Sequence, residues 1–214
     1  MKLIFILVAF SLSIPAFAAK FSLVGAANMA KPNGAAYSEQ MTTDGGFLLE
    51  FNVGKKGGVE LGVLRVDRAY TFSTTFGTAT TVPAASRGKT YVSSVTVPVI
   101  EIPLMYRLWF NRVLSFGIGG VASIACHNDY CGDATISTAG TGTDRSTLNQ
   151  NSVPIPAGGG DFAAAASLKL MTPLTQKFGI MADGRYNYGL SGGKFREVQG
   201  LAGLVFANNM RGKD

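Results

Sequence analysis

Apolar residues recur at every second position in several segments of this chain. In residues 113–125 the bulky set is Leu114, Phe116, Ile118, Ala122 and Ile124, which alternates with Ser115, Gly117, Gly119, Val121 and Ser123. Segments 47–53, 162–172 and 178–188 repeat the alternation. A period of two predicts β-strands with one bulky apolar face and one small or polar face. Strands of about ten residues are long enough to cross a bilayer when they are tilted.

Eight such segments can be placed along the chain: residues 20–30, 46–54, 58–72, 91–110, 113–125, 161–173, 178–190 and 198–207. Their connections alternate in length, with short ones at 55–57, 111–112 and 174–177 and long ones at 31–45, 73–90, 126–160 and 191–197. Short turns on one side and long loops on the other are typical of a transmembrane barrel with both termini in the periplasm. The pattern therefore predicts an all-β fold, an eight-stranded antiparallel up-and-down transmembrane β-barrel. Within it Pro103 suggests a bulge, because proline removes a ladder hydrogen bond.

The small or polar face of the strands carries charges at mid-strand positions: Glu50, Glu60, Glu101, Arg107, Lys169, Asp183 and Arg185. A soluble barrel keeps its apolar face inside, whereas a membrane barrel turns that face toward lipid and tolerates charge in its lumen. An eight-stranded barrel is only wide enough for side chains to fill it. We therefore expect these seven side chains to pair with one another in a polar network that plugs the lumen. A gated conduit or proton path through the same residues is the alternative.

The alternation fails in one place. Arg65 and Asp67 fall in phase with the apolar positions Val59, Leu61 and Val63 of the same segment. A charged side chain on the lipid-facing side would be costly within the bilayer. This phase therefore indicates that the strand has left the bilayer by Arg65.

The composition fits a membrane protein that does not cross with helices. Hydrophobic residues make up 47% of the 214 residues, charged residues only 15%, and the mean hydropathy is +0.23. Soluble domains typically have about 25% charged residues. Past the first twenty residues, no apolar run approaches the roughly 20 residues that a spanning helix needs.

The first eighteen residues have the features of a secretory signal peptide. Lys2 is followed by an apolar run at residues 3–10, and the small residues Ala16 and Ala18 form an A-x-A cleavage site. We therefore expect residues 1–18 to be removed and residues 19–214 to form one outer-membrane barrel domain. Export to an oxidising compartment also makes Cys126 and Cys131 expected disulfide partners.

Two short runs resemble a known family. Residues 58–64 read Gly-Val-Glu-Leu-Gly-Val-Leu and residues 100–106 read Ile-Glu-Ile-Pro-Leu-Met-Tyr. They are similar to strands of the outer membrane protein beta-barrel domain family, within the OmpA/OmpX-like eight-stranded outer-membrane barrels. The resemblance implies insertion into the outer membrane by the barrel-assembly machinery, which reads an aromatic residue near the end of the last strand. Phe206 is the candidate for that residue, followed by a polar tail at 208–214.

Aromatic residues near the strand ends or on the apolar face are candidates for the girdles that flank the apolar band of such barrels. They are Phe21, Tyr106, Trp109, Phe110, Tyr186, Tyr188 and Phe206. The surrounding outer-membrane lipids and lipopolysaccharide are expected partners, with basic side chains near the rims in contact with phosphates. The net charge of +6 is modest and scattered, so nucleic-acid binding is not expected.

The only histidine of the sequence, His127, lies between the two cysteines and near Asp129. A metal site and a catalytic dyad are the alternatives to the disulfide, which is favoured because thiolate ligands rarely survive export. We therefore expect no metal, no cofactor and no enzymatic activity.

The function expected from the sequence is a structural or surface-interaction role for a monomeric barrel, with an extracellular partner as an option for the long loops. The alternatives are a narrow channel, an enzyme that acts on envelope lipid, and a soluble periplasmic ligand-binding barrel.

Overall fold

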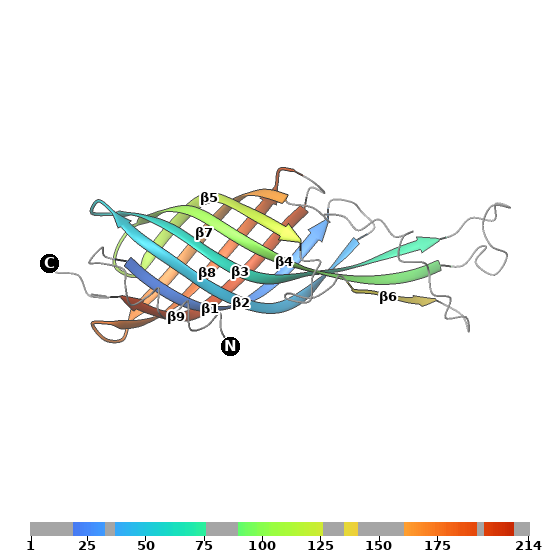
Figure 1. The fold of residues 1–214 in the computed structure, drawn as a ribbon, viewed down its shortest axis with the longest axis horizontal. Helices are drawn as coiled ribbons and strands as arrows, with labels where there is room; N and C mark the ends of the chain where they lie inside the picture. Colours follow the sequence, from blue (N-terminus) through green and yellow to red (C-terminus); the bar gives the residue numbers. More distant parts are fainter. Residues whose placement is uncertain are drawn as a thin grey trace.

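The structure, a computed structural model, describes residues 19–32, 37–75, 90–125, 135–140, 161–191 and 195–207. They form nine strands: β1 (Ala19–Pro32), β2 (Tyr37–Val53), β3 (Gly57–Thr75), β4 (Thr90–Trp109), β5 (Leu114–Ala125), β6 (Thr135–Gly140), β7 (Asp161–Pro173), β8 (Phe178–Gly189) and β9 (Phe195–Ala207). All of these except β6 close into an antiparallel barrel, because β3 pairs with β4 and β9 returns to β1 (Figure 1). The predicted all-β, eight-stranded antiparallel barrel is confirmed. Within the described residues no helix is long and apolar enough to cross a membrane.

Two strands occupy segments that the sequence pattern predicted to be loops. β2 begins at Tyr37, inside the predicted loop 31–45, and β6 lies inside the predicted loop 126–160. Both pair with the long β3–β4 hairpin where it extends past the rest of the barrel (Figure 1). Their sequences are rich in Ser, Thr and Gly, so period-two alternation is weak there and only the pairing partner reveals the strand.

The β2–β3 ladder contains an irregularity between Gln40 and Gly45. Side chains replace the missing ladder bonds around Asp67: its N–H donates to Asp44 Oδ2 at 2.6 Å, and its carbonyl accepts from Thr42 Oγ1 at 2.5 Å. Asn28 also donates to that carbonyl, at 3.2 Å. The irregularity is therefore a bulge whose backbone groups are satisfied by polar side chains, as bulges at barrel rims commonly are.

The bulge predicted at Pro103 is wrong. Leu61 lies opposite Leu104 and Leu64 lies opposite Glu101, so the β3–β4 register is the same on both sides of the proline. On the other side, Pro103 itself stays in register with Val121 of β5. The ladder tolerates the missing N–H without inserting a residue.

Side chains alternate strictly between the inside and the outside of the barrel. Along β7, β8 and β9 every second residue is buried and its neighbours are exposed. The exposed positions carry large apolar side chains such as Ile118 (58% exposed), Leu168 (53%) and Val198 (56%). The charged side chains of Glu60 and Arg107 are instead fully buried in the lumen. The barrel is thus apolar outside and charged inside, which is the reverse of a soluble barrel.

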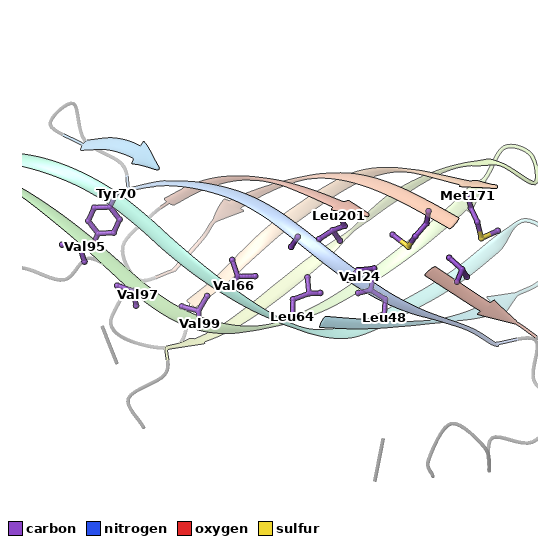
Figure 2. Close-up of a cluster of buried hydrophobic side chains, with 13 residues drawn as sticks. Val24, Leu48, Leu64, Val66, Tyr70, Val95, Val97, Val99, Met171 and Leu201 are labelled. Carbon is purple, nitrogen blue, oxygen red and sulfur yellow. The ribbon is translucent and has the colours of Figure 1, made fainter. Parts of the chain in front are cut away.

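Apolar side chains also share the lumen. The buried cluster comprises Val24, Ala26, Leu48, Leu64, Val66, Tyr70, Val95, Val97, Val99, Met171, Met181, Leu201 and Val205 (Figure 2). Met171 lies at one end of this cluster, and Tyr70 and Val95 lie at the other, toward the extended hairpin (Figure 2). Both apolar and charged side chains therefore point into the interior of the barrel.

Candidate functional site in the barrel lumen

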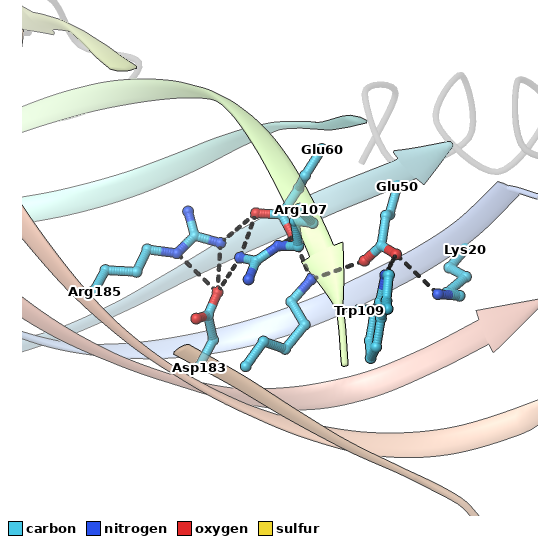
Figure 3. A network of polar contacts seen from close by, with 8 residues as sticks. Lys20, Glu50, Glu60, Arg107, Trp109, Asp183 and Arg185 are labelled. Atoms are coloured by element: carbon cyan, nitrogen blue, oxygen red, sulfur yellow. Dashed lines mark hydrogen bonds and ion pairs between the residues drawn. The ribbon is translucent and has the colours of Figure 1, made fainter. Parts of the chain in front are cut away.

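Glu60 is the centre of a buried ion-pair network, shown in Figure 3. Its carboxylate accepts two hydrogen bonds from Arg107, at 2.8 and 2.9 Å, and one from Arg185 at 2.7 Å. Lys169 Nζ forms a further ion pair with the same carboxylate. Three strands besides its own thus converge on one side chain, because β4, β7 and β8 each present an inward-facing base at the same level of the barrel.

Asp183 extends this network on one side. Its Oδ2 accepts from Arg107 Nη2 at 2.5 Å and from Arg185 Nε at 3.0 Å. Arg107 is therefore held in a fork between two carboxylates, the geometry in which a planar guanidinium forms its strongest hydrogen bonds. All three side chains are fully buried.

Glu50 extends the network on the other side. It accepts from Lys20 at 2.8 Å, from Lys169 at 3.2 Å and from the indole Nε1 of Trp109 at 2.7 Å (Figure 3). Lys20 also lies over the Trp109 ring, 4.0 Å from its centroid, in a cation–π contact. We call this whole set the Glu60 network: it contains the bases Lys20, Arg107, Lys169 and Arg185 and the acids Glu50, Glu60 and Asp183, a surplus of one positive charge.

A second buried set, which we call the Arg68 network, lies toward the extended hairpin. Arg68 Nη2 donates to Glu101 at 2.8 Å, to Ser123 at 2.9 Å and to Glu197 at 3.3 Å. Its Nη1 lies 3.5 Å from Asp161, and the guanidinium stacks on the ring of Phe195 at 3.8 Å. One base faces three acids here, so carboxyl groups outnumber bases in the Arg68 network.

Two amides complete the Arg68 network. Gln199 donates to Glu101 at 2.6 Å and Asn187 donates to Glu197 at 3.2 Å. The amide oxygens of both residues have no hydrogen-bond partner among the described residues. Buried carboxyl groups without partners are very costly, and these two donors supply hydrogen bonds that a single arginine cannot.

The structure brings six of the seven expected lumen residues into the Glu60 network, while Glu101 lies apart in the Arg68 network. The sequence interpretation did not include Lys20, Arg68, Asp161 and Glu197. Arg68 could have been predicted, because it lies an even number of residues after Glu60 on the same strand and therefore faces the same side. The sequence interpretation missed it because the charges at Arg65 and Asp67 interrupt the apolar alternation there. Those two residues do face outward, where Arg65 pairs with Asp44 at 2.7 Å and with Asp67 at 3.1 Å.

The expected girdle residues divide into two groups. Tyr106, Phe110, Tyr186, Tyr188 and Phe206 are exposed on the outside of the barrel. Phe21 is half-buried there, with its ring 6.4 Å from that of Phe206. Trp109 is the exception, because it lies two residues after Arg107 on β4 and therefore faces the lumen, as Arg107 does. Its indole points inward to Glu50 rather than toward lipid, which corrects the expectation for this residue.

Some expectations from the sequence lie outside the described residues. These are the signal peptide at 1–18, the Cys126–Cys131 disulfide and the surroundings of His127. Within the described residues no group of three or more His, Cys, Asp or Glu side chains is arranged to hold a metal ion.

The inverted polarity defines the class of protein. A barrel that exposes Leu and Ile and buries arginine–carboxylate networks is stable only where its outer surface meets hydrocarbon. A closed barrel also leaves no strand edge unpaired within the bilayer. With an even number of antiparallel strands, short turns at one end and its two longest connections, β3–β4 and β5–β7, at the other, the chain is an eight-stranded outer-membrane barrel. Its location is the outer membrane, and its surroundings are membrane lipids.

Comparison with known proteins gives fold similarity only. No protein-family model and no protein of curated function matches the chain. Among solved structures, it is similar to Ail of Yersinia pestis, with 12% identity over 89% of this chain and 98% of that one and a TM-score of 0.45. It is also similar to Neisserial surface protein A, with 10% identity, 88% and 96% coverage and a TM-score of 0.47. OprG of Pseudomonas aeruginosa has 11% identity, 89% and 96% coverage and a TM-score of 0.47.

Proposed function

We propose that this protein is a non-enzymatic outer-membrane barrel with a plugged lumen, serving a membrane-stabilising or surface-interaction role. The observation that carries the proposal is the Glu60 network. Its central members Glu60, Arg107, Asp183 and Arg185 are fully buried and bonded to one another. A permeation pathway needs polar groups that can exchange partners with water, whereas these groups are bonded to one another across the lumen, with only single atoms such as Arg107 Nη1 and Asp183 Oδ1 without a partner among the described residues.

The extended hairpin supports the surface-interaction part of the proposal. β3 and β4 continue past the level where β5 pairing ends, and β2 and β6 flank them there. The predicted loop 73–90 connects the ends of β3 and β4 on this side. A rigid sheet that carries loops beyond the membrane is suited to present a binding surface to an extracellular partner. We further propose that the barrel acts as a monomer and is inserted by the barrel-assembly machinery.

Conductance across a planar lipid bilayer tests the plug. We expect no steady conductance from the refolded protein, and a leak when Arg107→Ala and Arg185→Ala are combined, because both cations of the central fork are then missing. Lys55→Ala, in the exposed β2–β3 turn, is the matched control and should remain silent. Steady conductance of the unmodified protein would instead favour the channel.

The enzyme alternative has a separate test. Cells with and without the protein are compared for their lipid A profiles, which should be the same if the barrel has no lipid-modifying activity. A difference that disappears in a His127→Ala variant would favour an envelope-lipid enzyme. The soluble ligand-binding barrel is not retained, because its apolar face would have to point inward.

A further inference from the structure

The outward-facing side chains of β9 and β1 change from apolar to basic at the same level. On β9 the outward series ends with Val198 (56% exposed) and then Arg196, and on β1 it ends with Met29 (41% exposed) and then Lys31. Arg196 and Lys31 are both exposed and lie directly opposite each other in the β1–β9 ladder.

The height of these two bases matches the edge of the membrane. Arg196 lies about ten residues from Phe206 on β9, or about 33 Å along the strand at about 3.3 Å per residue. With a tilt of about 45°, the two residues differ in height by about 23 Å, close to the roughly 25 Å of the apolar band in outer-membrane barrels. Phe206 clusters with Phe21 and Phe178 at the short-turn end. Arg196 and Lys31 therefore lie at the level of the outer-leaflet headgroups.

Like charges directly opposite each other in a ladder are destabilising unless another group compensates them. The one carboxylate found near them in the described part of the chain is Glu39, 4.0 Å from Lys31, with both side chains nearly half exposed. A pair with this exposure contributes little. No ion pair of Arg196 occurs among the described residues. Among the described residues the repulsion between the two bases is therefore left largely uncompensated, and a bound anion would relieve it.

Tyr188 completes the surface. It lies opposite Arg196 in the β8–β9 ladder and is 38% exposed on the same side. A tyrosine ring at the membrane boundary buries its apolar body in lipid and keeps its hydroxyl available for a polar group. Arginine in turn can hold a phosphate through two parallel hydrogen bonds, which a lysine beside it can supplement as a point charge.

We propose that Lys31, Arg196 and Tyr188 form a binding site for the phosphate of an outer-leaflet glycolipid, the lipid A part of lipopolysaccharide. This inference rests on the outer-membrane location, and it assigns the lipid contact to one face of the barrel, across β8, β9 and β1. The site is separate from both lumen networks, since all three side chains point away from the lumen.

Native mass spectrometry of the refolded full mature protein in detergent micelles tests the site by counting bound lipid. The probes are bisphosphorylated lipid A, the same lipid with its phosphates removed, and phosphatidylglycerol. We expect the phosphorylated lipid A to bind best. Combining Lys31→Gln with Arg196→Gln should weaken its binding about tenfold, because charge-assisted contacts to phosphate are lost. Lys55→Gln with Lys56→Gln removes the same charge at the short-turn end and should change nothing.

A variant that is expected to strengthen binding, rather than weaken it, extends the test. Glu39→Gln removes the carboxylate that competes for Lys31, so it should strengthen lipid A binding. Equal binding to the unmodified protein and the Lys31/Arg196 double variant, or equal binding with and without phosphates, would overturn the site. Inhibition by millimolar inorganic phosphate alone would assign the site to free phosphate and overturn the lipid assignment. Conductance and the lipid A profiles of cells are measured separately, so a failed site leaves the proposed function intact.

Discussion

At the scale of single residues, the charged side chains in the lumen pair with one another rather than with water. Glu60 receives three bases, and Arg107 reaches two acids, so no central charge of this network depends on one partner. Small residues make this geometry possible. A Cβ placed on Gly117 would lie 2.7 Å from Ser167 Oγ and 3.2 Å from Arg107 Nη1. The absence of a side chain at Gly117 therefore leaves the space that the Arg107 guanidinium needs.

Replacement of the central acid tests the network. We expect Glu60→Gln to lower the free energy of unfolding by about 3–5 kcal/mol, because breaking a buried pair leaves uncompensated charge on Arg107, Arg185 and Lys169. Urea titration in lipid vesicles measures it, followed by the fluorescence of the single tryptophan, Trp109. Glu39→Gln, in an exposed pair, is the control and should leave the unfolding midpoint nearly unchanged. Equal effects of the two substitutions would contradict the central role of Glu60.

A second prediction concerns the space at Gly117. Gly117→Ala should cost about 1–3 kcal/mol in the same titration, since the added methyl group overpacks the lumen beside Arg107. Gly184 is the matched control, because a Cβ there meets no atom within 4 Å. Gly184→Ala should be neutral or stabilising, as glycine weakens a strand interior. A loss of similar size at both positions would mean that backbone conformation, not lumen packing, sets the effect.

At the scale of elements, the β3–β4 hairpin belongs both to the barrel and to the sheet that extends beyond it. β3 has 19 residues and β4 has 20, about twice the length needed to cross the bilayer. Inside the barrel their partners are β2 and β5. Beyond it β4 exchanges β5 for β6, with Val95 opposite Ile136. Alternation predicted both long strands closely, but it could not predict β6, whose place depends on the free edge that β4 offers.

Proline substitution in β6 tests this pairing. In an antiparallel ladder, successive N–H groups point alternately toward and away from the neighbouring strand. One of the two variants Ser137→Pro and Thr138→Pro should therefore break a bond to β4, and the other should be tolerated. Hydrogen exchange of residues 91–96 is the measurement, and only the disruptive variant should accelerate it. Unchanged protection in both variants would rule out the β4–β6 pairing.

At the scale of the whole molecule, the barrel is organised by which solvent each face meets. On β1 and β9 the outside is apolar up to Lys31 and Arg196. The inside carries the Glu60 network, with one more base than acid, followed by the Arg68 network, in which acids outnumber bases. Charges that would serve solubility in a globular protein here hold strands together across the lumen, which explains a charged fraction of only 15%.

A depth series tests the placement in the membrane. Leu168 lies about five residues above the short-turn end of β7, near the middle of the apolar band, and Val198 lies near its outer edge. Leu168→Arg should cost about 2–4 kcal/mol and Val198→Arg about 0–1 kcal/mol in vesicles, because the penalty for arginine falls toward the interface. Leu168→Ala serves as a control for lost side-chain volume. A larger penalty at Val198 than at Leu168 would contradict this orientation.

The sequence by itself determined where the eight barrel strands lie, apart from the first part of β2, and the inward direction of the seven charges expected in the lumen. Each of these depends on a period of two, which is a local property of a strand. Only the tertiary structure decided which charges meet. Arg185 and Glu60 are 125 residues apart, and Glu101 joins Arg68 and Glu197 rather than Arg107. Those contacts depend on the register and stagger of all eight strands around the closed ring, which no single segment specifies.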